Sequence, residues 1–274
     1  MRIKLISGVC AAAAVAFLAA PALAAPSGSI QAGYDYSTTS FGGDTLKSNG
    51  GNVSGNVDMP VFGNWTVQLD GAYMATQGTV AGLTIKPQVT DGQLSGFYSA
   101  HMGRIGALVG TGQFKETLSA GGASASENFN ATYYGVFGDW YGGDHFTVSA
   151  RGGAVNANQG LGSSSFYGAR LTGYLPHDTA LYGTVDYVSF HGSSISQTNA
   201  GVSGEWLVSK QTPFAVTGGW TNSKLSEFGS SLTSNVFSIG GKFYFGAGKS
   251  LREHQREGAE SWGATSPLHT AFLF

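Results

Sequence analysis

The side chains best suited to chemistry in this chain are six histidines and the charged residues that lie within segments of alternating polarity. A hydrolytic site needs a histidine beside a serine or carboxylates. Five histidines fall near short turns or in the C-terminal segment: His101, His145, His177, His254 and His269. His191 has Ser189, Ser193 and Ser194 nearby but no close acidic residue, so we interpret it as a solvated loop residue and predict no enzyme activity.

Other chemistries lack their sequence signatures. No phosphate-binding loop, dinucleotide fingerprint or zinc-ligand spacing occurs, so we predict no cofactor and no metal. The net charge is −2, and it becomes −4 if Arg2 and Lys4 are removed with a leader. This weakly acidic balance argues against a nucleic-acid partner.

The charged residues share one parity of the alternating segments: Asp35, Asp58, Asp70, Arg151, Arg170, Asp186, Glu205 and Lys242. If the other parity meets lipid, these residues line an interior. They then either create a field across a narrow pore that filters small polar solutes, or they form ion pairs that fill it, with Arg170 on Asp186 and Lys242 on Asp35. Inward Phe97, Tyr134, Tyr182 and Tyr244 would narrow that interior.

The alternation itself predicts strands. Period-2 patterns recur through residues 28–246, for example with Trp65, Val67, Leu69 and Tyr73 on one parity. We expect about twelve strands, with ten or fourteen as alternatives because 76–94 is irregular. The expected spans are 28–38, 46–59, 64–76, 87–100, 104–116, 128–140, 144–156, 164–175, 179–190, 196–209, 213–223 and 234–246.

The expected connections differ in length between the two ends. Short turns are predicted at 60–64, 101–104, 141–144, 176–179 and 209–213. Longer polar loops are predicted at 38–46, 76–86, 117–127, 157–164, 190–196 and 223–233. Such an asymmetry is typical of transmembrane β-barrels, in which the short turns face the periplasm.

Aromatic residues and glycines favour a transmembrane, antiparallel, up-and-down β-barrel over a soluble sandwich or solenoid. Glycines on the apolar parity, such as Gly71, Gly135 and Gly183, would leave gaps in a sandwich core, whereas lipid tails would fill them. Aromatic residues recur near strand ends, as membrane-interface girdles require. We assign Tyr34, Trp65, Tyr98, Phe129, Phe137, Phe146, Tyr187, Trp206, Trp220, Phe237 and Phe245 to these girdles.

The N-terminus predicts export. Arg2 and Lys4 precede an apolar run that ends at Pro21 and a small-x-small site, so we expect a signal peptide over residues 1–24. A retained anchor is the weaker alternative. Cys10 lies inside this run, so the mature chain would contain no cysteine.

These features resemble Gram-negative, porin-like outer-membrane proteins, through the strand pattern of residues 25–246 and the terminal Phe274. The resemblance implies an outer-membrane location, with lipid and the barrel-assembly machinery as partners. It also implies a final strand that ends in an aromatic residue. Here the last long strand ends near Phe243 and Phe245, and a polar tail follows over residues 247–274, which we expect in the periplasm.

Two questions about the tail stay open at this point. The assembly signal is carried by Phe243 and Phe245, which we favour, or by Phe272 and Phe274. The charged run 249–257 is either a short helix or, by default, a solvated extension.

The sequence thus predicts an outer-membrane channel for passive diffusion of small hydrophilic solutes. The alternative is a structural or surface-interaction barrel with a closed, salt-bridged interior. The oligomeric state does not follow from the sequence.

Overall fold

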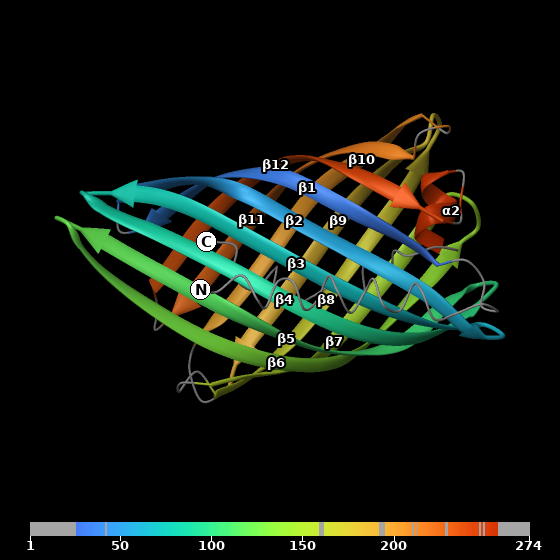
Figure 1. Ribbon diagram of the computed structural model, residues 1–274, viewed down its shortest axis with the longest axis horizontal. Helices are drawn as coiled ribbons and strands as arrows, with labels where there is room; N and C mark the ends of the chain where they lie inside the picture. The colour runs from blue at the N-terminus through green and yellow to red at the C-terminus, as the bar shows by residue number, and fades with distance from the viewer. Residues whose placement is uncertain are drawn as a thin grey trace.

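The computed structural model describes residues 26–41, 43–158, 162–191, 195–209, 211, 213–227, 230–246, 248 and 250–256. Within this part of the chain, twelve antiparallel strands form one closed barrel, in which β1 pairs with both β2 and β12 (Figure 1). The expected fold of an antiparallel barrel with about twelve strands is confirmed. The expected signal peptide lies outside the described residues.

The strands follow one another around the barrel in chain order. They are β1 Ser27–Phe41, β2 Asp44–Phe62, β3 Trp65–Val80, β4 Leu83–Ala100, β5 Gly103–Ala120, β6 Ala123–Gly142, β7 Phe146–Ala157, β8 Gly162–Leu175, β9 Thr179–Phe190, β10 Ser196–Ser209, β11 Phe214–Glu227 and β12 Ser230–Phe245. A short helix, α2, follows at Leu251–Arg256.

The connections at one end of the barrel lie where the sequence predicted short turns. At the other end, four of the predicted long loops are wrong, because the strands continue through most of 38–46, 76–86, 117–127 and 223–233. β3 and β4 are joined by Ala81 and Gly82, with φ of 48° and 79°, and β5 and β6 by Gly121 and Gly122, with φ of 56° and 88°. Positive φ at both central residues is the geometry of a type I′ turn, which matches strand twist.

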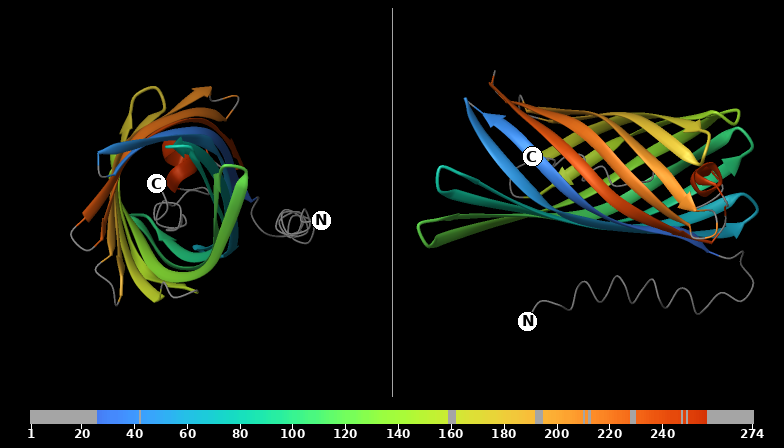
Figure 2. Two further views of the ribbon diagram at one scale, coloured as in Figure 1. Left: turned by 90° about the vertical axis from the view of Figure 1, so that its left-hand side faces the viewer. Right: turned by 90° about the horizontal axis from the view of Figure 1, so that it is seen from above.

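These extensions make the barrel wall uneven. β2 to β6 contain 16–20 residues each, whereas β7 and β9 contain 12 each. The β3–β4 and β5–β6 hairpins project from the end opposite α2 (Figure 2). A tilted strand needs roughly 9–11 residues to cross a bilayer, so the long strands exceed that span.

The predicted parity is correct along most strands but wrong in β6. The sequence placed Gly135 and Phe137 on the lipid side, yet Phe137 is 3% exposed and Tyr133, which shares their parity, is fully buried, both inside the barrel. Val136 is instead 63% exposed on the outer face. Over residues 133–138 both faces of β6 are apolar, so alternation within this stretch does not distinguish them, and only Asp139 marks the inward side.

The inward aromatic rings in this region lie over glycines of neighbouring strands. Tyr133 is paired with Gly110, and Phe137 with Gly106. A Cβ atom at Gly110 would lie 2.3 Å from the Tyr133 ring, so no larger residue fits there without movement. Pairing an aromatic residue with a cross-strand glycine fills the space that the missing side chain leaves. Because such pairs depend on register, only the strand pairing reveals them.

The charged run after β12 is not a solvated extension over the residues that the structure describes. Residues 251–256 form α2, and Leu251, His254 and Gln255 are buried. Seen along the barrel, α2 falls within the ring of strands, at the end with the short turns (Figures 1 and 2). No helix in the described part of the chain has the length and apolar character needed to cross a bilayer.

The outer face of β6 offers a test of the corrected parity. We expect Val136→Arg to lower the free energy of unfolding in phospholipid vesicles by about 2–4 kcal/mol, because a charge would face hydrocarbon near the midplane. Urea titration followed by tryptophan fluorescence measures the change, and Val136→Leu serves as the control. Unchanged stability of Val136→Arg would contradict an outward position.

Candidate functional site

The interior of the barrel is the candidate site, because the charged residues gather there. All eight residues that the sequence assigned to the lumen lie on inward positions. Six of them are buried: Asp35, Asp58, Arg151, Asp186, Glu205 and Lys242. Asp70 and Arg170 are half-buried. Their role in solute selection stays a prediction.

Ion pairs cross the inner wall between neighbouring or next-neighbouring strands. Arg151 donates to Asp186 at 2.8 Å and Arg104 donates to Asp139 at 2.6 Å, with each side chain almost inaccessible to solvent. The predicted pair of Arg170 with Asp186 is therefore wrong. β7 and β9 flank β8, and the Arg151 side chain reaches past β8 to Asp186.

Glu205 is the centre of a second polar cluster. Its two carboxylate oxygens accept hydrogen bonds from the Tyr182 hydroxyl at 2.8 Å and from the Tyr244 hydroxyl at 2.5 Å. The Lys242 ammonium lies 4.0 Å from the same carboxylate. The Arg170 guanidinium lies 3.7 Å from the centre of the Tyr182 ring, a cation–π contact. The cluster thus combines two cations with one fixed carboxylate.

This cluster borders a cavity within the barrel. The cavity measures about 210 Å³, and its lining includes Gln31, Asn52, Arg170, Tyr182, Glu205 and Lys242. Most of these groups are polar or charged, so the cavity can hold water or a small hydrophilic solute. We call this side of the lumen the polar wall, formed by the cavity-lining residues of β1, β2 and β8–β12.

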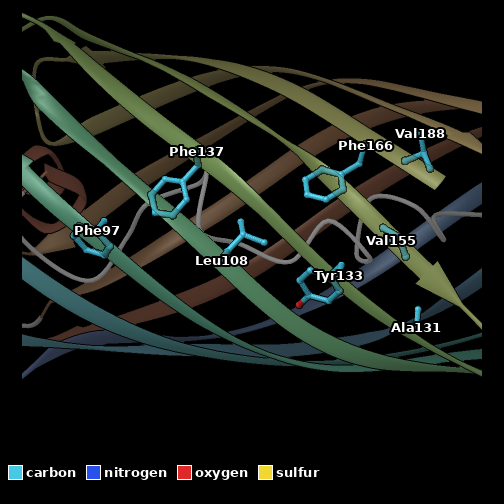
Figure 3. Packing of buried hydrophobic residues seen from close by; sticks show 8 residues of the cluster. All are labelled: Phe97, Leu108, Ala131, Tyr133, Phe137, Val155, Phe166 and Val188. Atoms are coloured by element: carbon cyan, nitrogen blue, oxygen red, sulfur yellow. The ribbon is translucent and has the colours of Figure 1, made fainter. Parts of the chain in front are cut away.

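A different part of the inner wall is apolar. Eight buried side chains of β4–β9 form one cluster, which we call the apolar stripe: Phe97, Leu108, Ala131, Tyr133, Phe137, Val155, Phe166 and Val188 (Figure 3). The stripe runs from residues near the short-turn end, such as Phe97, to residues near the opposite end, such as Val188. The lumen therefore has two chemically different sides.

Hydrogen bonds fix the last residues of α2 in the mouth at the short-turn end. Arg104 donates to the carbonyl of Gln255, and the Gln255 amide donates to the Tyr182 hydroxyl at 2.5 Å. The Arg256 guanidinium donates to the carbonyls of Gly143 at 2.5 Å and Phe146 at 2.6 Å. These partners come from β5, β6–β7 and β9, so α2 is tied to several sides of the mouth.

Apolar contacts hold the first turn of the helix. Leu251 is 1% exposed and belongs to a cluster with Tyr182, Leu207 and Tyr244. The His254 ring stacks on the Tyr244 ring, with centroids 4.3 Å apart. By contrast, the ion pair between Arg252 and Asp144 is exposed, and such pairs contribute little. These apolar contacts and the hydrogen bonds above therefore hold α2 in the mouth.

The residues that the sequence reasoning missed are Arg104, Asp139 and Gln255. Asp139 carried a usable signal, because it shares the parity of Phe137, and a carboxylate does not belong on a lipid face. The sequence places Arg104 in a predicted turn and Gln255 in the predicted tail. Nothing in their spacing links them, since their contact joins β5 to a segment more than a hundred residues away.

The predicted girdle residues separate into two groups. The structure places most of them on the outer face: Tyr34, Trp65, Tyr98, Phe146, Tyr187, Trp206, Trp220 and Phe237 are exposed, and Phe245 is half-buried. Phe137 points inward, and Phe129 is half-buried and stacks on Phe114. Of the predicted inward aromatics, Phe97, Tyr182 and Tyr244 are buried, whereas Tyr134 is exposed. The interfacial role of the exposed group stays a prediction.

His191 has two serine partners at the far end of the barrel. Its ring nitrogens lie 2.8 Å from the Ser165 hydroxyl and 3.2 Å from the Ser163 hydroxyl. No group of three or more acidic, histidine or cysteine side chains within the described ranges is placed to hold a metal ion. The expectation that the chain is not an enzyme stays a prediction.

Comparison with known proteins places this barrel among known architectures. No protein-family model and no curated protein matches the chain. Among solved structures, the translocator domain of the autotransporter NalP from Neisseria meningitidis aligns with a TM-score of 0.56 and 14% identity, over 88% of this chain and 95% of that one. The chain has the fold of an outer-membrane β-barrel.

Two further structures show the range of the likeness. The β domain of the Bordetella autotransporter BrkA aligns with a TM-score of 0.52 and 10% identity, over 80% of this chain and all of that one. The monoaromatic hydrocarbon channel CymD aligns with a TM-score of 0.49 and 11% identity, over 80% and 89%. At these identities the likeness concerns the outer-membrane barrel fold alone.

Replacing one partner of the Arg104–Asp139 pair should cause a large loss of stability. We expect Asp139→Ala to destabilise the barrel by roughly 3–5 kcal/mol, because Arg104 would stay buried without this carboxylate. Asp139→Asn, which keeps an acceptor oxygen, should lose less. The midpoint of urea unfolding in detergent reports both values, and equal midpoints for Asp139→Ala and the unmodified protein would refute the expectation.

Proposed function

We propose that this protein is a channel of the Gram-negative outer membrane for passive diffusion of small hydrophilic solutes, exported with a cleavable signal peptide. The observation that carries the proposal is the polar wall, on which Arg170, Lys242 and Glu205 border a cavity within a closed barrel. In this proposal the outer face meets lipid, and the barrel-assembly machinery inserts the chain.

The polar wall suits weakly bound, small polar solutes. Two cations and one carboxylate around a small cavity give a directional field, which orients a solute that carries both donors and acceptors. The hydroxyls of Tyr182 and Tyr244 already donate to Glu205, so a passing solute competes with existing bonds. Passage rather than tight binding is the expected result.

α2 sets the resting state of this channel. Because the helix is held in one mouth by Leu251, Gln255 and Arg256, we expect low conductance unless α2 is displaced. The same observation favours the second candidate function, a structural or surface-interaction barrel with a permanently closed interior. The two candidates differ in whether a barrel with a released helix conducts.

Planar bilayers test this difference. We expect Leu251→Asp/Arg256→Ala to raise the frequency or size of conductance steps, because the variant removes the apolar contact at one end of α2 and the carbonyl contacts at the other. Arg252→Ala is the matched control, since Arg252 belongs to the same helix but makes an exposed ion pair. Heat-modifiable gel mobility verifies folding, and a folded but silent double variant would support the closed barrel instead.

Ion selectivity tests the polar wall. In the released-helix background, Glu205→Gln should shift the reversal potential toward anion preference, because it removes the fixed negative charge of the cavity. Glu227→Gln removes a carboxylate from the exposed end of β11 and serves as the control. Recording at low ionic strength limits screening, whose length is about 10 Å at 0.1 M salt. Equal shifts in both variants would count against a path along this wall.

A further inference from the structure

The apolar stripe is an unusual lining for a barrel interior. An apolar wall that faces a polar cavity would expose hydrocarbon to water, yet Tyr133 is fully buried and Phe166 is 2% exposed. The rings of Phe97 and Phe137 pack edge to face with centroids 6.1 Å apart, so part of the burial is mutual. The stripe lies on one side of the lumen only, so burial this complete points to a further covering group.

The stripe begins beside the end of α2. The Arg104 guanidinium donates to the carbonyl of Gln255 and also lies 5.4 Å from the centre of the Phe97 ring. The Tyr141 hydroxyl donates to the carbonyl of Arg256 at 3.3 Å. The chain therefore leaves α2 inside the mouth, next to the first member of the stripe.

The segment that leaves α2 has the length and chemistry to cover the stripe. Residues 257–274 outnumber those of any of the strands β7–β9, and an extended chain rises about 3.3 Å per residue. The segment contains Trp262 and Leu268 and ends in Ala-Phe-Leu-Phe, and its only acidic side chains are Glu257 and Glu260. Its apolar end is too short to cross a membrane by itself.

We infer that residues 257–274 enter the lumen from α2 and that the terminal apolar residues 271–274 dock on the apolar stripe. The tail then covers the apolar stripe and leaves the polar wall uncovered. Tethering by α2 gives the segment a millimolar effective concentration at the stripe, so modest contacts suffice for occupancy. This inference holds whether or not the barrel conducts.

Cysteine cross-linking tests the docking directly. The only natural cysteine, Cys10, is replaced by serine so that engineered pairs report alone. One cysteine replaces Phe272, and the other replaces either Leu108, on the stripe, or its neighbour Val109, which is 54% exposed on the outer face. A short bis-maleimide reagent is added to outer membranes, and folding of each variant is verified by heat-modifiable gel mobility.

We expect Leu108→Cys with Phe272→Cys to give on the order of tenfold more intramolecular product than Val109→Cys with Phe272→Cys, because only the first pair shares a compartment at high effective concentration. Equal yields from folded proteins, or product from the Val109 pair alone, would overturn the inference. Val188→Cys with Phe272→Cys tests the far end of the stripe, so a tail docked at another register still gives product.

A second measurement covers the case in which cross-linking disturbs assembly. A single cysteine at Phe274 should react slowly with a maleimide–polyethylene glycol too large for the lumen, and faster after Leu251→Asp/Arg256→Ala. Rapid labelling in the unmodified background would show a tail outside the barrel and overturn the inference. Conductance is read separately, so a silent but cross-linked barrel rejects only the channel, and a conducting barrel without cross-links rejects only the docked tail.

Discussion

The closure of the sheet is the constraint on which the other features depend. β12 pairs with β1 along the seam from Phe245 to Thr233, so neither strand presents an unpaired edge. In hydrocarbon an unpaired backbone group costs several kcal/mol, and a closed antiparallel sheet satisfies all of them between strands. Once closed, the sheet divides its side chains strictly between an apolar exterior and an interior. The interior is consequently free to hold charge.

Charged and apolar side chains occupy different parts of the interior. Charged groups meet their partners within the wall, as Arg151 does with Asp186, and a cavity lies beside Glu205 and Lys242. The strands that carry Tyr133 and Phe166 present rings instead, each facing a glycine of an adjacent strand. A lumen with one polar side and one apolar side differs from a uniformly polar pore, because polar groups line only part of its circumference.

Sequence patterns predicted the barrel well because the lipid side is chemically uniform. Strand number, short-turn positions and the inward charges all follow from period-2 alternation. The same rule failed at β6, where the inner face is as apolar as the lipid-facing side, and it assigned Phe137 to the outer face. The sequence also favoured a solvated extension over a helix at α2, since Gln255 and Arg256 belong to a charged run whose partners, Arg104 and the Gly143 carbonyl, are distant in sequence. These contacts depend on strand register and on barrel closure, and no local sequence pattern specifies either.

The position of α2 in the chain makes the mouth dependent on the folded sheet. Its partners include Arg104 of β5, Phe146 of β7, Tyr182 of β9 and Tyr244 of β12, which lie on different strands of the wall. The full set of contacts therefore requires the curved and paired sheet, whereas the sheet itself pairs strand with strand, without α2. Displacing the helix would thus unblock the mouth and leave the β1–β12 seam intact.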